Sequence, residues 1–304
     1  MRFEGAEVRV KSVVKNAYND IMNNHTMALA AGLSYYFVLS LFPFLILLAS
    51  LLAYLPIPHL FDQILTSMAN VVPPDSMRLV RKVISTVVQP NGGLLTFGIV
   101  GTLWIVSGGF NSLIEALNVA YDVPETRPIW KTRLLALGLA FVIGLLLTIA
   151  LASIVLGPKL GGWIADLVGL GATFKQVWPY IRWSGSVAFT ILAVELVFWW
   201  APNIKQRFWA TLPGAVIGVV FWLGSSYGLG IYFQRFAHYN KTYGVLGAAI
   251  ALMVWLYWSW FAILVGAEIN SELVKAGGGG NLELKGKPPA EVKPRPAWEE
   301  RPAA

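Results

Sequence analysis

Three carboxylates and two side-chain amides are the residues of this sequence that could do chemistry within apolar surroundings. All five lie in long apolar runs or at their ends. An ionisable group in such a run is a functional candidate by default, and a side-chain amide there can hydrogen-bond across helices. The five candidates are Glu115, Glu195, Glu268, Asn111 and Asn270.

Glu195 is the deepest of these charges, near the end of an apolar run and followed by LVFWWAP. Its helical face also carries Gly185 and Trp199, so we expect the carboxyl to point into a helix bundle. Placing it there unpaired costs roughly 2.5–3.5 kcal/mol on insertion scales. Glu195 is therefore either a functional group or the structural partner of a cation. The cations near enough for that pairing are Arg133, Lys205 and Arg207.

Glu268 and Asn270 belong to the sequence GAEIN at the end of the last apolar segment. Counted at 1.5 Å per residue from Gly244, Glu268 is about 36 Å along its helix, which is beyond a hydrocarbon core of about 30 Å. Gly266 and Asn270 are four residues apart and share a face. We predict a polar cluster at the cytoplasmic end of the second, fourth and sixth apolar segments.

Small residues form stripes on two of the apolar segments. Glycine at such positions lets helix backbones approach closely in a membrane, and it can also thin the wall of a pocket. The pattern permits both interpretations. On the second segment the stripe shares its face with Asn111 and Glu115. The glycines that we single out are Gly101, Gly108, Gly214, Gly218 and Gly266.

The composition is that of an integral membrane protein. Of 304 residues, 56% are apolar and 13% are charged, against about 25% charged in soluble domains. A membrane-spanning helix needs roughly 20 apolar residues. We therefore predict an all-α, polytopic fold with six transmembrane helices. Their approximate ranges are 27–55, 93–118, 134–156, 178–200, 209–233 and 244–273.

The distribution of lysine and arginine predicts the orientation of these spans. Fifteen of these residues fall on the side that holds both termini, and eight fall on the other side. Positive charge favours the cytoplasm, so we expect both termini to be cytoplasmic. The predicted parts are a cytoplasmic arm (1–26), a six-helix domain (27–275) with short amphipathic helices in an external loop (56–92), and a disordered cytoplasmic tail (276–304).

The sequence lacks the motifs of several classes of enzyme and metal site. The sequence has no cysteine, and its three histidines stand in three different segments without metal-ligand spacing. It contains no P-loop, no dinucleotide fingerprint and no nucleophile elbow. We therefore expect no metal, no cofactor and no enzymatic activity.

Four stretches, in order, resemble the YihY/virulence factor BrkB family: LAAGLSYYFVLSLFPFLILLASL, SGGFNSLIEALNVAYDVPETRPIWKTRLLALGL, NKTYGVLGAAIALMVWLYWSW and LVGAEINSEL. The resemblance covers roughly residues 10–275. It implies a six-helix, multi-pass protein of the bacterial inner (plasma) membrane. Many members are labelled ribonuclease BN. A nuclease needs a metal held by clustered histidines or carboxylates, or an acid–base pair at an aqueous surface, and this sequence shows neither.

Three functions remain as hypotheses. The first is handling or transport of phospholipids or lipid-linked envelope components, with membrane lipids as partners. The second is a non-transporting scaffold that binds an envelope protein. The third is a transporter of small solutes, which usually shows broken helices at the membrane midplane. We expect no nucleic-acid partner, because the basic N-terminal arm suits anionic headgroups as well as it suits RNA.

Overall fold

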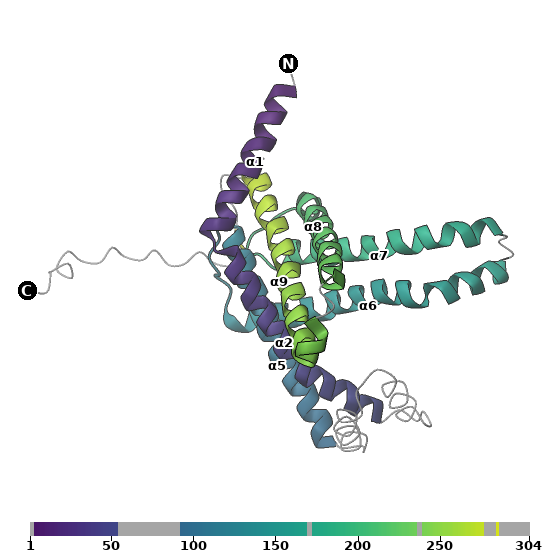
Figure 1. The fold of residues 1–304 in the computed structure, drawn as a ribbon. Coiled ribbons are helices and arrows are strands. Elements are labelled where there is room, and N and C mark those ends of the chain that lie inside the picture. Colours follow the sequence, from purple (N-terminus) through teal and green to yellow (C-terminus); the bar gives the residue numbers. More distant parts are fainter. Residues whose placement is uncertain (1–2, 54–91, 169–171, 236–238, 277–283, 286–304) are drawn as a thin grey trace, which may run out of the picture.

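The computed structural model describes residues 3–53, 92–168, 172–235, 239–276 and 284–285 (Figure 1). Within these ranges the regular secondary structure is α-helical, apart from a single isolated β-bridge that joins Ile204 to Leu284. The all-α prediction is confirmed for this part of the chain. The helices are α1 (Phe3–Asn23), α2 (Thr26–Ala53), α5 (Gly92–Ala120), α6 (Ile129–Val168), α7 (Ala172–Trp200), α8 (Phe208–Arg235) and α9 (Tyr239–Ala276).

Each predicted span coincides with one of these helices. Among the described residues, five helical segments are long and apolar enough to cross a membrane, and a shorter apolar stretch lies in α2 (Thr26–Ser40). The count of six spans and the side on which the termini lie stay predictions. The amphipathic helices predicted in the external loop lie outside the described residues. The five segments are Leu95–Ala120, Ile129–Ile154, Gln176–Trp200, Phe208–Phe233 and Ala249–Ala276.

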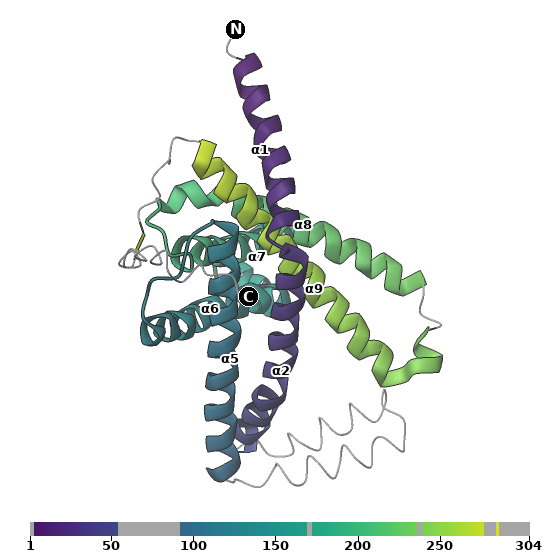
Figure 2. The ribbon, with the colours of Figure 1, turned by 90° about the vertical axis from the view of Figure 1, so that its left-hand side faces the viewer.

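Six helices of the described chain pack in pairs that form three hairpins: α2 with α5, α6 with α7, and α8 with α9. Figures 1 and 2 show that the hairpins diverge from one shared end, where the α1–α2, α5–α6 and α7–α8 connections meet. The fully buried residues concentrate at this shared end, which we call the vertex; they include Leu117, Tyr121, Phe198 and Leu264. The hairpins therefore share a core only where they meet.

The helix α6 is longer than a membrane is thick. The 40 residues of α6 would span about 60 Å at 1.5 Å per residue, twice the hydrocarbon thickness of about 30 Å. A helix that long must tilt or protrude. Only a minor share of each apolar window is buried within the protein, from 11% of the window in α8 to 33% in α7. Most of each window is thus not covered by the described protein.

Two tight turns position the vertex. His25, between α1 and α2, and Asp122, directly after α5, have φ angles of 51° and 52°. Residues other than glycine are uncommon in this left-handed region, where histidine and aspartate are among the better tolerated. The turn at His25 bends the chain between α1 and α2, beside α9, which packs on both helices (Figure 2). The polar residues of these three segments are thereby brought together.

Candidate polar site at the vertex

The Asn270 side chain binds the backbone of α8. Its Nδ2 donates to Thr211 O at 2.6 Å, and its Oδ1 accepts from Gly214 N at 3.1 Å. All three residues belong to the first turns of α8 or to the facing part of α9, and Asn270 is fully buried. Pro213 lies in the same stretch and donates no backbone hydrogen bond. The amide thus holds the start of α8 against α9.

Glycines allow this close approach. A Cβ atom on Gly266 would lie 2.5 Å from Gly214 O and 3.0 Å from Gly218 Cα, and one on Gly214 would lie 2.5 Å from Asn270 Cγ. Three of the glycines singled out in the sequence therefore meet between α8 and α9, in the geometry of helix packing. The other two lie between α5 and α2: Cβ atoms on Gly101 and Gly108 would lie 3.2 Å from Pro43 and 3.9 Å from Tyr36.

Glu195 points into the same interface. It is 1% exposed, and its Oε1 lies 2.5 Å from the Thr211 hydroxyl oxygen. The ion pairs of the described residues include none with Glu195. Arg133, one of the expected partners, instead donates to Ser107 Oγ at 2.9 Å and stacks over Trp104. The geometry therefore does not support a structural salt bridge with Arg133.

Unpartnered polar atoms surround this carboxyl. Glu195 Oε2, the Tyr121 hydroxyl and Gln206 Oε1 are buried, and none of them has a hydrogen-bond partner among the described residues. Tyr121 is close enough to Asn270 and Gln206 for their side chains to act on it, and burial raises the pKa of its phenol. Tyr121 thus connects the end of α5 to this group, which we call the Glu195 group: Tyr121, Glu195, Gln206, Thr211 and Asn270.

Glu268 forms a second buried site a short distance away. Its Oε1 accepts from Asn24 Nδ2 at 3.1 Å and from Thr26 Oγ1 at 3.0 Å. Both donors are neutral; Asn24 belongs to the α1–α2 connection, and Thr26 is the first residue of α2. The carboxyl therefore fastens α9 to the start of the first hairpin. Its field also reaches Tyr121 of the Glu195 group.

Glu268→Ala should destabilise the protein by about 1–3 kcal/mol, because it leaves the donors of Asn24 and Thr26 without their acceptor. Thermal unfolding in detergent micelles measures this. Glu115→Ala is the matched control, since Glu115 is an exposed residue and should change stability by no more than about 0.5 kcal/mol. Equal losses in the two variants would show that Glu268 does not hold the α1–α2 connection.

Lys275 gathers three carboxylates beside this second site. Its Nζ lies 2.7 Å from Asp122 Oδ2, 2.7 Å from Glu272 Oε1 and 3.4 Å from Asp20 Oδ2. Burial raises the pKa of Asp20, and the charge of Lys275 opposes that rise. The ammonium joins α1, the α5–α6 connection and α9. No group of three or more histidine, aspartate or glutamate residues in the described part of the chain is arranged to hold a metal ion.

Two asparagines join the connections between hairpins. Asn203, in the α7–α8 connection, donates from its backbone N to Asn118 Oδ1 at 2.8 Å. Its side-chain Nδ2 donates to Pro124 O at 2.9 Å and to Thr126 Oγ1 at 2.8 Å. Asn118 and Asn203 are both buried. The α5–α6 and α7–α8 connections are thus one hydrogen-bonded unit.

Glu125 and Arg127 complete that unit. Arg127 donates to both carboxylate oxygens of Glu125, from Nε at 2.8 Å and from Nη2 at 2.6 Å, and Nη2 also donates to Ala201 O at 2.8 Å. Burial alone would raise the pKa of Glu125, but the hydrogen bonds from Arg127 and Asn118 outweigh burial and lower it. The guanidinium also caps the C-terminal end of α7.

The residues predicted from the sequence divide into two sets. Glu195, Asn270 and Glu268 lie in the buried vertex. Asn111 and Glu115 instead bond to each other at 2.7 Å on α5, where Glu115 is exposed. The structure therefore does not bring these two into the cluster. A helical face is defined only relative to its own axis, and the glycines of this face of α5 lie against α2.

The predicted set omitted several residues that complete the two sites, among them Thr211, Tyr121, Gln206 and Asn24. A sequence signal existed for one more, Thr26. It stands in NHTMALA just before an apolar run, the place where threonine commonly begins a helix. The others carry no local signal. Thr211 and Asn24, for example, bond to partners 16 and 244 residues away in the chain.

Five apolar helical segments in the described residues and a polar, helix-lined vertex define a multi-pass, all-α membrane protein. The sequence model of the Virulence factor BrkB family matches residues 17–289. The chain belongs to this family, as the sequence motifs predict.

Named relatives are similar to this chain over most of its length. The chain is 36% identical over 265 residues to a protein named as ribonuclease-like, YfkH of Bacillus subtilis (strain 168), covering 87% of this chain and 96% of YfkH. It is 28% identical to a UPF0761 membrane protein of Rhodospirillum centenum, with 86% of this chain and 57% of the relative covered. A UPF0761 membrane protein of Tolumonas auensis is 26% identical, with coverages of 83% and 82%. No solved structure matches the chain.

Proposed function

We propose that this protein handles phospholipids or lipid-linked envelope components in the bacterial inner membrane. The observation that supports this most directly is the divergence of the hairpins. Only 11–33% of each apolar window is buried within the protein, which leaves apolar faces for other ligands. Acyl chains are the abundant ligands of such faces in a bilayer.

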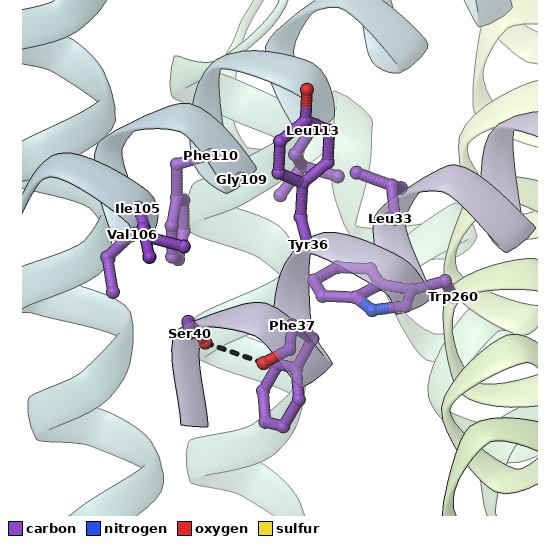
Figure 3. A pocket seen from close by; sticks show the side chains of 10 residues that line it. All are labelled: Leu33, Tyr36, Phe37, Ser40, Ile105, Val106, Gly109, Phe110, Leu113 and Trp260. Carbon is purple, nitrogen blue, oxygen red and sulfur yellow. Dashed lines mark hydrogen bonds between the residues drawn. The ribbon is translucent and has the colours of Figure 1, made fainter. Parts of the chain in front are cut away.

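Two apolar crevices lie between the hairpins. Figure 3 shows the first, a cavity of about 120 Å³ between α2, α5 and α9, with Tyr36, Phe110 and Trp260 on its walls. The second is about 240 Å³ and lies between α6, α7 and α8. Its walls are apolar except for hydroxyls such as Thr190. Both are smaller than the roughly 300–1,000 Å³ of drug-binding pockets, and a segment of an acyl chain suits their shape and lining.

Filling the second crevice should slow lipid movement several-fold. Thr190→Trp places a large ring in it, whereas Leu192→Trp adds the same ring to an exposed position of the same helix. The measurement is movement of headgroup-labelled phospholipid between leaflets of liposomes that contain the purified protein. We expect transfer above that of empty vesicles, slowed by Thr190→Trp and unchanged by Leu192→Trp. Wild-type transfer equal to that of empty vesicles would exclude passive lipid movement.

We expect this protein to have no ribonuclease activity, although the name of YfkH contains the word ribonuclease. Hydrolysis of RNA requires a metal cluster or an acid–base pair at a surface that RNA can reach. The carboxylates of the described vertex are instead buried or bound to Lys275 and Arg127. Incubation of the purified protein with RNA and divalent metal ions tests this, with no cleavage as the expected result.

A scaffold is a second candidate, favoured by α1. Val14, Tyr18 and Met22 are spaced by four residues, so they share one face of the helix, and all three are more than half exposed. Such a stripe suits an envelope protein partner. Under this hypothesis, lipid transfer would be absent and the replacement of Tyr18 by glutamate would abolish partner binding without unfolding the membrane domain.

A further inference from the structure

The contacts of the Thr211 hydroxyl determine where a proton lies at the vertex. Its oxygen is 2.5 Å from Glu195 Oε1 and 2.8 Å from Phe208 O. A threonine hydroxyl has one hydrogen to donate, so it can serve only one of these two acceptors. In helices, threonine commonly donates to a carbonyl three or four residues earlier, and Phe208 is three residues earlier. The hydrogen of the 2.5 Å contact must then come from the Glu195 carboxyl.

The surroundings of Glu195 favour the same protonation state. The side chain is buried, its Oε2 has no hydrogen-bond partner in the described chain, and no described ion pair reaches it. A carboxylate without a cation and with at most one donor is strongly unfavourable in an apolar interior. The neutral carboxylic acid removes that cost and supplies the missing hydrogen.

We infer that Glu195 is a proton-binding site of this protein, occupied by a proton in the packed vertex. Binding converts the carboxylate to the acid, with the new O–H donating to Thr211 Oγ1. Release returns that proton to water and leaves the carboxylate. This inference does not depend on the proposed lipid path.

Among the described residues, the groups that face Glu195 supply no positive charge that would replace the proton. The helix α8 contributes Thr211, and the end of α5 contributes the phenol of Tyr121. From α9 the facing groups are the Asn270 amide and, beyond Tyr121, the Glu268 carboxyl.

Infrared difference spectroscopy of the full-length protein in lipid nanodiscs tests the inference. All spectra are taken in a Glu268→Gln background, because Glu268 is a second buried carboxyl with neutral donors and contributes a band of its own when it is protonated. Near neutral pH this background protein should show the C=O band of a protonated carboxylic acid, and adding Glu195→Gln should remove it. Thr211→Val removes the acceptor of the O–H and should shift the band to higher frequency. A background spectrum without the band, or a band that survives when Glu195→Gln is added, would overturn the inference.

Thermal unfolding provides an independent measurement on the same variants. Glutamine mimics the neutral acid and can donate to Thr211 from its amide, so Glu195→Gln should unfold at the wild-type temperature. Glu195→Ala leaves a cavity and an unpaired hydroxyl, so it should unfold at a lower temperature. If Glu195→Gln unfolds at a temperature as low as that of Glu195→Ala, a neutral side chain does not replace the native one, and the inference is wrong.

Discussion

Replacing Gly266 by alanine is expected to cause one of the two largest losses of stability in this protein. The added Cβ would lie 2.5 Å from Gly214 O and 3.0 Å from Gly218 Cα, and both neighbours are backbone atoms of α8 that cannot rotate away. Overpacking of this kind costs about 1–3 kcal/mol. Moving α8 aside also weakens the two hydrogen bonds of Asn270, each worth about 0.5–1.5 kcal/mol. The combined loss should exceed about 2 kcal/mol.

The matched control for this change is Gly224→Ala on α8, because a Cβ at Gly224 meets no described atom within 4 Å. Alanine is a better helix former than glycine by up to about 1 kcal/mol. Gly224→Ala should therefore leave the unfolding temperature unchanged or raise it slightly, whereas Gly266→Ala lowers it. Thermal unfolding followed by circular dichroism in the same detergent compares the two. Equal unfolding temperatures would mean that α8 and α9 do not pack as closely as the structure shows.

Asn270→Asp is the second change with a large expected effect. It replaces the Nδ2 donor by an oxygen that faces Thr211 O, at a site where the present separation is 2.6 Å. It also places a carboxylate in a fully buried position without a described cation partner. Leaving a buried charge uncompensated costs about 3–5 kcal/mol. We expect the variant to be unfolded or strongly destabilised, with the N-terminal end of α8 released from α9.

Asn111→Asp provides the comparison for that experiment. Asn111 also bonds to another side chain, but its partner Glu115 is exposed to the surroundings of α5. A like-charge pair four residues apart on a helix surface costs only about 0.2–0.5 kcal/mol. Limited proteolysis and thermal unfolding should distinguish the two variants clearly. A mild phenotype for Asn270→Asp would indicate that water reaches the vertex in the folded protein.

Much of the helical architecture can be predicted from the chain itself. Apolar runs of about 20 residues specify membrane-spanning helices whatever their neighbours, because unpaired backbone groups are unfavourable in hydrocarbon. Unpaired polar side chains are also unfavourable in hydrocarbon, so Glu195 and Asn270 can be recognised as exceptional from the sequence. The glycines at positions 214 and 266 likewise predict a close contact between helices, and the structure has this contact between α8 and α9.

The sequence by itself thus determined the helices, the family and which buried polar groups need an explanation. Only the tertiary structure decided which residues these buried polar groups bind. The Glu195 carboxyl meets Thr211 and no described cation, Glu268 meets Asn24 and Thr26, and Glu115 faces outward. The physical reason is that helical periodicity relates residues on one helix, whereas contacts between helices depend on their rotation, tilt and crossing. Those quantities are set at the vertex by the packing of several segments at once.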